Sequence, residues 1–183
     1  MHRSEPDRRR RSIALDRRTA KGICALVVVV LLGFAVLSAL AEDVETDPDL
    51  APLFSLPNLD GDDVALVEYR GNVIILDFWA TWCKICTKTF PDLHALGQAY
   101  ADRGVVLLVV SLDKSAEEAR DHLIENEFAT DNVLWGSLKA ARAVKDLYGV
   151  GGIAHAFLID RAGYIRYSGH PTRLTPEELE RWL

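Results

Sequence analysis

Two cysteines, Cys83 and Cys86, stand two residues apart in the segment DFWATWCKIC, directly after an apolar run. Thiols at this spacing can bind a metal ion, close a structural disulfide, or exchange electrons with the thiols of another protein. A purely structural disulfide is disfavoured, because so short a closed loop stabilises a fold very little. The elements around the two cysteines must then distinguish metal binding from thiol–disulfide exchange.

The apolar run predicts a buried strand over 72–79, and the pattern that follows predicts a helix over 84–102. Unpaired N–H groups and a partial positive charge at a helix N-terminus stabilise a thiolate. We therefore expect Cys83 to be the exposed, low-pKa nucleophile and Cys86, on the same helix face, to attack a mixed disulfide formed at Cys83. Asp77 precedes them on the strand. If it is buried rather than solvent-facing, desolvation raises its pKa and makes it a proton acceptor for Cys86.

The rest of the body alternates strands with helices, which predicts a largely parallel sheet covered on both faces. Strands are expected at 64–69, 104–112, 133–135, 155–160 and 164–169, and helices at 115–128, 138–147 and from Thr175 onward. No Ser/His/Asp arrangement, phosphate loop or pair of carboxylates typical of hydrolases stands out. Trp79 is expected to pack beneath the cysteines, and Trp82 to lie on the surface near Cys83 and offer a client an apolar contact.

The N-terminal part differs in charge and hydropathy. The first 21 residues carry eight Arg or Lys and three Asp or Glu, which leaves 13 basic and 24 acidic residues in the rest. An acidic body argues against a nucleic-acid partner. Residues 22–41 contain no charge over a length that can span a bilayer, and Arg and Lys precede them while acids follow. We expect a transmembrane signal anchor, or alternatively a cleaved signal peptide, with the body exported; Cys24 is then an apolar filler.

The body resembles the TlpA/ResA-like membrane-anchored thioredoxins. The resemblance covers residues 51–183 and rests on DFWATWC, on CTKTFPDL with Pro91 where the family's helix kinks, on VVLLVVSLD, and on LYGVGGIAHAFLIDRAG followed by TPEELERWL. It implies a thioredoxin fold: a central mixed sheet with helices on both faces and an N-terminal β-hairpin extension. It also implies thiol–disulfide exchange with Cys83 as nucleophile, Cys86 as resolving cysteine and Asp77 as buried acid, often in reducing the haem-binding cysteines of apocytochrome c.

Two departures from the family pattern affect the site. Lys84 and Ile85 stand between the cysteines where Pro-Pro or Gly-Pro is commoner, and a lysine beside a thiolate favours the reduced form, so the couple becomes more oxidising. Ala154 stands where the family has a cis-proline. A cis bond before a non-proline residue costs about 2.5–4 kcal/mol, which favours a trans peptide here and puts in doubt the backbone platform by which Ile153 binds a client.

A histidine, His155, follows the missing proline and allows a second interpretation, in which Cys83, Cys86 and His155 hold a metal ion as in a copper carrier. No second C-x-x-C completes a four-ligand zinc site, so the preferred interpretation has no metal. No cofactor is expected beyond the redox-active cysteine pair.

The sequence thus predicts four parts: a basic cytoplasmic tail (1–21), a membrane segment (22–41), an acidic linker (42–51) and a thioredoxin-like domain (52–183). We expect a monomeric, membrane-anchored, extracytoplasmic or periplasmic oxidoreductase that acts on client proteins and takes electrons from a membrane donor. A disulfide-forming oxidase would use the same site in the opposite direction.

Overall fold

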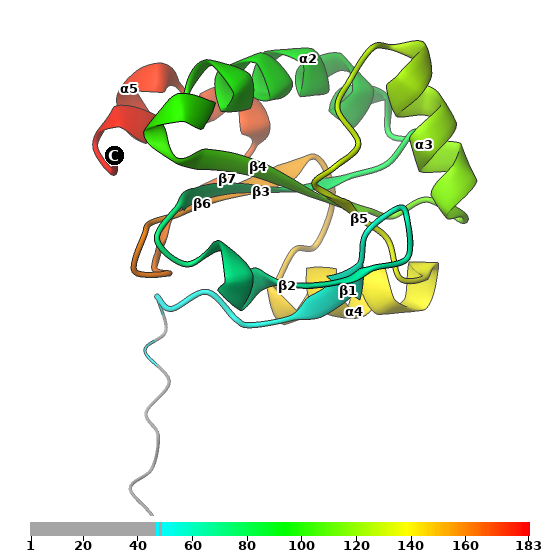
Figure 1. Ribbon diagram of the computed structural model, residues 1–183, viewed down its shortest axis with the longest axis horizontal. Coiled ribbons are helices and arrows are strands. Elements are labelled where there is room, and N and C mark those ends of the chain that lie inside the picture. The colour runs from blue at the N-terminus through cyan, green and yellow to red at the C-terminus, as the bar shows by residue number, and fades with distance from the viewer. Residues whose placement is uncertain (1–46, 48) are drawn as a thin grey trace, which may run out of the picture. The chain divides into compact units, whose positions relative to one another are not determined.

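The computed structural model describes Asp47 and residues 49–183 (Figure 1). The expected basic tail and membrane segment lie outside these residues. Among the described residues, none of the helices combines the length and the apolar character that crossing a bilayer demands.

A five-stranded mixed sheet forms the centre of the domain, in the order β5-β4-β3-β6-β7. Its strands are β3 (Val73–Trp79), β4 (Val105–Ser111), β5 (Val133–Leu134), β6 (His155–Ile159) and β7 (Ile165–Gly169). The pairs β3–β4 and β4–β5 are parallel, whereas β3–β6 and β6–β7 are antiparallel. The expectation of a largely parallel sheet is therefore right for one half only. The short RAG connection after β6 reverses the chain into a hairpin, which makes the β6–β7 pair antiparallel.

Helices and a hairpin cover the two faces of this sheet. The α-helices are α2 (Lys84–Ala99), α3 (Ala116–Glu125), α4 (Leu138–Leu147) and α5 (Pro176–Glu180), and the hairpin consists of β1 (Ser55–Pro57) and β2 (Asp63–Ala65). Figure 1 shows α2 and α5 on one face, and α4 with the β1–β2 hairpin on the other. The expected N-terminal hairpin extension is thus confirmed.

Strand β3 lies at the middle of the core, and all seven of its residues are buried. Side chains alternate between the faces of a strand. Ile74 and Phe78 belong to the larger apolar cluster with Tyr148, which directly follows α4, and Val73 and Ile75 belong to a second cluster with Leu93 of α2. Asp77 shares the parity of Val73 and Ile75, so its carboxyl lies on the face that α2 covers.

Several boundaries differ from the expectation, because the periodicity of apolar residues does not by itself locate the ends of elements. The strand expected at 64–69 gives way after Ala65 to a 3-10 turn at Leu66–Tyr69, and the helix expected to reach 102 ends at Ala99, before a 3-10 turn at Ala101–Arg103. The fold also includes the end of the expected linker: Ala51 N–H donates to Gly163 O at 2.9 Å, and Leu50 forms a bridge with Tyr164.

Candidate active site

The two cysteines form a disulfide at the N-terminus of α2, with their Cα atoms 5.2 Å apart. Cys83 is the N-cap residue, and its Sγ accepts a hydrogen bond from the Cys86 backbone N–H at 3.2 Å. That N–H is one of the donors a helix leaves unpaired in its first turn. Upon reduction the same donor and the helix dipole would stabilise a thiolate on Cys83 rather than on Cys86.

Cys83 is more exposed to solvent than Cys86, which is the predicted order. Cys83 keeps 8% of its surface exposed and Cys86 only 1%. Cys83 is thus less open than an exposed nucleophile would be, because the disulfide holds its sulfur against the helix. Around it the surface is apolar: Trp82 is 61% exposed and Ile85 is 54% exposed. Trp82 therefore lies on the surface, as expected, where a client could contact it, and Lys84 beside Cys83 is exposed as well.

The Asp77 carboxyl is buried beneath α2, so the solvent-facing alternative is wrong. Its exposed fraction is 2%, and Oδ1 has no hydrogen-bond partner among the described residues. Burial raises the pKa of Asp77 from 3.8 to about 7. A carboxyl with this pKa can accept and release a proton near neutral pH, as the sequence predicted for a partner of Cys86.

Aromatic packing fixes the strand and the helix that carry these groups. Trp79 is fully buried, and its ring centroid lies 5.4 Å from that of Phe90 on α2 and 5.4 Å from that of His122 on α3. Phe90 also contacts Phe128 edge to face, with the centroids 5.1 Å apart. Pro91 lies inside α2, as expected.

A second buried carboxyl, Asp113, bonds to the active-site turn, and the sequence did not predict this contact. It is 0% exposed and accepts hydrogen bonds from the Thr81 backbone N–H at 3.0 Å, the Thr81 hydroxyl at 2.7 Å and the Ser111 hydroxyl at 2.9 Å. The Trp135 indole N–H donates to its backbone carbonyl at 3.0 Å. An acid directly after the buried strand 104–112 was the only sequence signal for this residue.

The loop before β6 holds the other predicted site residues. Ile153 and Ala154 are half-buried, and the peptide bond between them is cis, which the sequence had left open. Contacts on both sides hold this loop in place. Before it, Val150 N–H donates to Lys145 O, and after it, His155 pairs with Phe78 on β3.

His155 faces β7 rather than completing a metal site. Its Nε2 lies 3.0 Å from Ser168 Oγ, and its ring packs on Phe157 with the centroids 4.9 Å apart. Burial, with a smaller contribution from the charge of His170, lowers the pKa of His155. Within residues 47 and 49–183, no three His, Cys, Asp or Glu side chains come together closely enough to hold a metal ion. The copper-carrier interpretation therefore has no third ligand on the described chain.

Comparison with known proteins places the chain in a family. The sequence profile described as the AhpC/TSA family matches residues 48–168. Thiol-disulfide oxidoreductase ResA of Geobacillus kaustophilus is 33% identical over 73% of this chain and 74% of its own. This chain belongs to the AhpC/TSA family, with ResA-like relatives. Another relative, the thioredoxin-like protein YneN of Bacillus subtilis, is 29% identical over 73% of this chain and 76% of its own.

Solved structures of the same kind share the fold of this AhpC/TSA member. A thiol:disulfide interchange protein from a Bacteroides species matches with a TM-score of 0.63 and 26% identity, over 73% of this chain and 84% of that one. The thioredoxin domain of a thiol-disulfide oxidoreductase from Bacteroides vulgatus matches with a TM-score of 0.62 and 26% identity, over 72% and 91%. The protein is a thiol–disulfide oxidoreductase with a thioredoxin-like fold, and its Cys83 and Cys86 are joined as a disulfide.

Proposed function

We propose that this ResA-like protein is a membrane-anchored, extracytoplasmic reductase of disulfides in client proteins, for example in cytochrome c maturation. The observation that carries the proposal is the Cys83–Cys86 disulfide at the N-terminus of α2, with the carboxyl of Asp77 buried on the face of β3 beneath that helix. The nucleophile, the resolving thiol and a group able to take its proton thus come from two adjoining elements.

Each turnover of the reduced protein would transfer two electrons. The Cys83 thiolate attacks one sulfur of the client disulfide, forms a mixed disulfide and releases the other client sulfur as a thiolate, which takes a proton from solvent. Cys86 then gives its proton to Asp77 and attacks Cys83 Sγ. The mixed disulfide breaks, the second client sulfur leaves and is protonated, and the Cys83–Cys86 disulfide forms. Asp77 returns its proton when a donor reduces the pair again.

The surroundings of the sulfurs support a protein client and a protein electron donor. Trp82 and Ile85 offer apolar surface beside Cys83, and Ile153 and Ala154 are the backbone platform predicted for a client segment. The cysteine pair is itself the redox group, so no organic cofactor is invoked. Because the domain would be exported, its electrons would come from a membrane protein.

Membrane attachment is proposed from the sequence alone. The uncharged run 22–41 is long enough to cross a bilayer, and the excess of Arg and Lys before it orients the N-terminus toward the cytoplasm. The body would then lie in a compartment where disulfides persist. The relatives are named as thiol-disulfide oxidoreductases or as thioredoxin-like proteins. The cytochrome client comes from the family resemblance.

The decisive experiment is the reduction potential of the Cys83–Cys86 pair in the full chain, with Cys24→Ala so that no third thiol reports. A value near −270 mV or lower, with reduction of insulin disulfides, supports the reductase. A value near −120 mV would make the protein a disulfide donor and overturn the direction proposed. Parallel titrations with and without a chelator complete the design, since thiols that react only after chelation would indicate metal carriage instead.

A further inference from the structure

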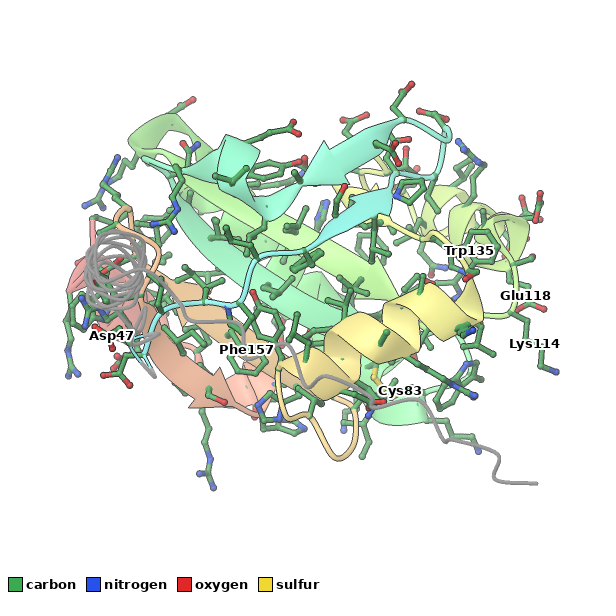
Figure 2. The ribbon with its side chains drawn as sticks, turned by 90° about the horizontal axis from the view of Figure 1, so that it is seen from below. Asp47, Cys83, Lys114, Glu118, Trp135 and Phe157 are labelled. Carbon is green, nitrogen blue, oxygen red and sulfur yellow. A yellow bond between two sulfur atoms is a disulfide. The ribbon has the colours of Figure 1, made fainter. Side chains whose placement is uncertain are left out.

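The buried carboxyl of Asp113 is connected to the cysteine pair through the turn that contains Thr81. Asp113 directly follows Leu112, whose backbone N–H donates to Trp79 O at 2.8 Å, so the ends of β3 and β4 are joined here. Figure 2 shows Cys83, Lys114 and Trp135 toward the same end of the domain, away from Asp47. The exchange reaction itself does not require an acid at position 113. The Asp113 side chain is nevertheless fully buried.

The Asp113 carboxyl acts only as an acceptor in the hydrogen bonds that it forms. Oδ1 accepts from both the backbone N–H and the hydroxyl of Thr81, and Oδ2 accepts from the Ser111 hydroxyl. Ser111 Oγ is committed in turn, because it accepts from the Asp113 backbone N–H at 3.2 Å. A carboxyl surrounded only by donors is suited to the ionised form, which accepts and cannot donate. Within the described residues no Lys, Arg or His forms an ion pair with it.

The residue that Asp113 holds lies two positions before the nucleophile. Thr81 and Cys83 are joined by two peptide units, so their Cα atoms are at most about 7 Å apart. The turn is short and tight, since the Cys83 backbone N–H bonds back to Ala80 O at 3.1 Å. Any rotation of Thr81 would move the N-cap sulfur relative to the Cys86 N–H that now bonds to it.

We propose that Asp113 is a positioning residue for the redox pair: through Thr81 it holds Cys83 at the N-terminus of α2, and its fixed negative charge opposes the Cys83 thiolate. The inference depends on thiol–disulfide exchange at this site but not on the client or on the direction of electron flow. Anchoring favours the thiolate and charge disfavours it, so the two effects can be separated by substitutions that remove one and leave the other.

Two variants make this separation. Asp113→Asn keeps the shape and an Oδ1 that accepts from Thr81, but it removes the charge. Thr81→Val keeps the charge and the size but removes the hydroxyl bond, and Thr81→Ser restores that bond. The control is Thr175→Val, the same change at the N-cap of α5, where the hydroxyl accepts from Glu178 N–H at 3.3 Å.

The readout is the pH at which Cys83 becomes half-reactive toward iodoacetamide, followed by mass spectrometry on the reduced full chain with Cys24→Ala. We expect Asp113→Asn to lower this midpoint by about one pH unit, because one nearby negative charge is gone. We expect Thr81→Val to raise it, by up to about one unit, as the N–H bond to sulfur weakens. Thr81→Ser should restore the original midpoint.

Melting temperatures measured on the same proteins distinguish positioning from a purely structural role. Thr175→Val is expected to lower the melting temperature without moving the Cys83 midpoint. If Asp113→Asn and Thr81→Val behave in the same way as this control, the proposal is overturned. Should Asp113→Asn not fold, the Thr81→Val and Thr81→Ser pair decides alone. A failed reductase assay would count against the proposed function but leave this midpoint measurement intact.

Discussion

The difference in exposure between Cys83 and Cys86 supports the different steps proposed for them. Cys83 keeps 8% of its surface exposed and is the one a client would reach first, whereas Cys86 is only 1% exposed. We expect Cys83→Ser to abolish disulfide reduction, and Cys86→Ser to accumulate a mixed disulfide between Cys83 and the client. Non-reducing gels and mass spectrometry in the Cys24→Ala background measure both. Trapping by Cys83→Ser instead would reverse the assignment.

Also at the scale of single residues, the ionisation of Asp77 makes the free energy of unfolding depend on pH. Its pKa is about 7 in the folded protein against an ordinary 3.8, so the folded state holds the proton more tightly than the unfolded state does. The stabilisation this brings is complete below about pH 4 and is lost as pH rises through 7. Asp77→Asn cannot ionise and avoids the loss.

The oxidised Asp77→Asn variant should therefore match the native protein in free energy of unfolding at pH 4 and exceed it at pH 8, by up to about 4 kcal/mol. Urea titrations at the two pH values measure this difference. Equal unfolding free energies at pH 8 would show that the carboxyl does not titrate near neutrality. The variant should also resolve mixed disulfides more slowly, since Cys86 loses its proton acceptor.

Lys84 is the remaining residue whose charge can tune the couple. Its cation next to Cys83 favours the thiolate and hence the reduced form. Lys84→Ala should lower the reduction potential by roughly 5–20 mV, a small shift because the side chain is exposed and screened by salt. Lys88→Ala, one turn further along α2, serves as the control. A Lys88 effect as large as that of Lys84 would contradict a local interaction.

At the scale of elements, the placement of α2 on β3 decides where the sulfurs sit relative to Asp77. Phe90 forms the contact: it is 2% exposed and packs between Trp79 of β3 and Phe128, which follows α3. Phe90→Ala is expected to lower the free energy of unfolding by roughly 3–5 kcal/mol, measured by denaturant titration. Phe90→Leu, which retains most of the volume, should lose less, and an equal loss would argue against packing as the cause.

At the scale of the whole molecule, the chain enters the domain at the end opposite to the redox pair. Ile165 N–H bonds to Asp49 O at 2.7 Å, which ties the entry point to the β6–β7 connection. That connection adjoins the start of β3, since Ile159 pairs with Ile74, whereas the cysteines follow the end of β3. Figure 2 shows Asp47 and Cys83 toward opposite sides of the domain. A tether at this end would leave the site open to clients.

The proposed membrane anchor gives a prediction at this scale. The full chain should sediment with membranes and resist extraction at high salt, whereas residues 47–183 produced with an export signal should be recovered in the soluble fraction. Immunoblots of fractionated cells measure this, and alkaline carbonate washing separates a spanning helix from surface attachment. A full-length product that appears soluble and shortened would instead favour a cleaved signal peptide.

By itself, the sequence predicted the cysteine pair that the structure joins as a disulfide, the strand before it and the helix after it. Local rules suffice for these: apolar runs become buried strands, an N-cap position activates a thiol, and helix patterns continue until a cap. Thus α4 was predicted at 138–147 and is observed there, and Trp82 lies on the surface as predicted.

Only the tertiary structure decided the features that depend on residues far apart in the chain. The burial of Asp77 required α2 to cover its face of the sheet, and the role of Asp113 required the end of β4 to meet the turn at Thr81, 32 residues earlier. The contact of His155 with Ser168 likewise depends on the neighbouring strand β7. Burial and hydrogen-bond partners come from long-range packing, which a local pattern of residue types does not specify.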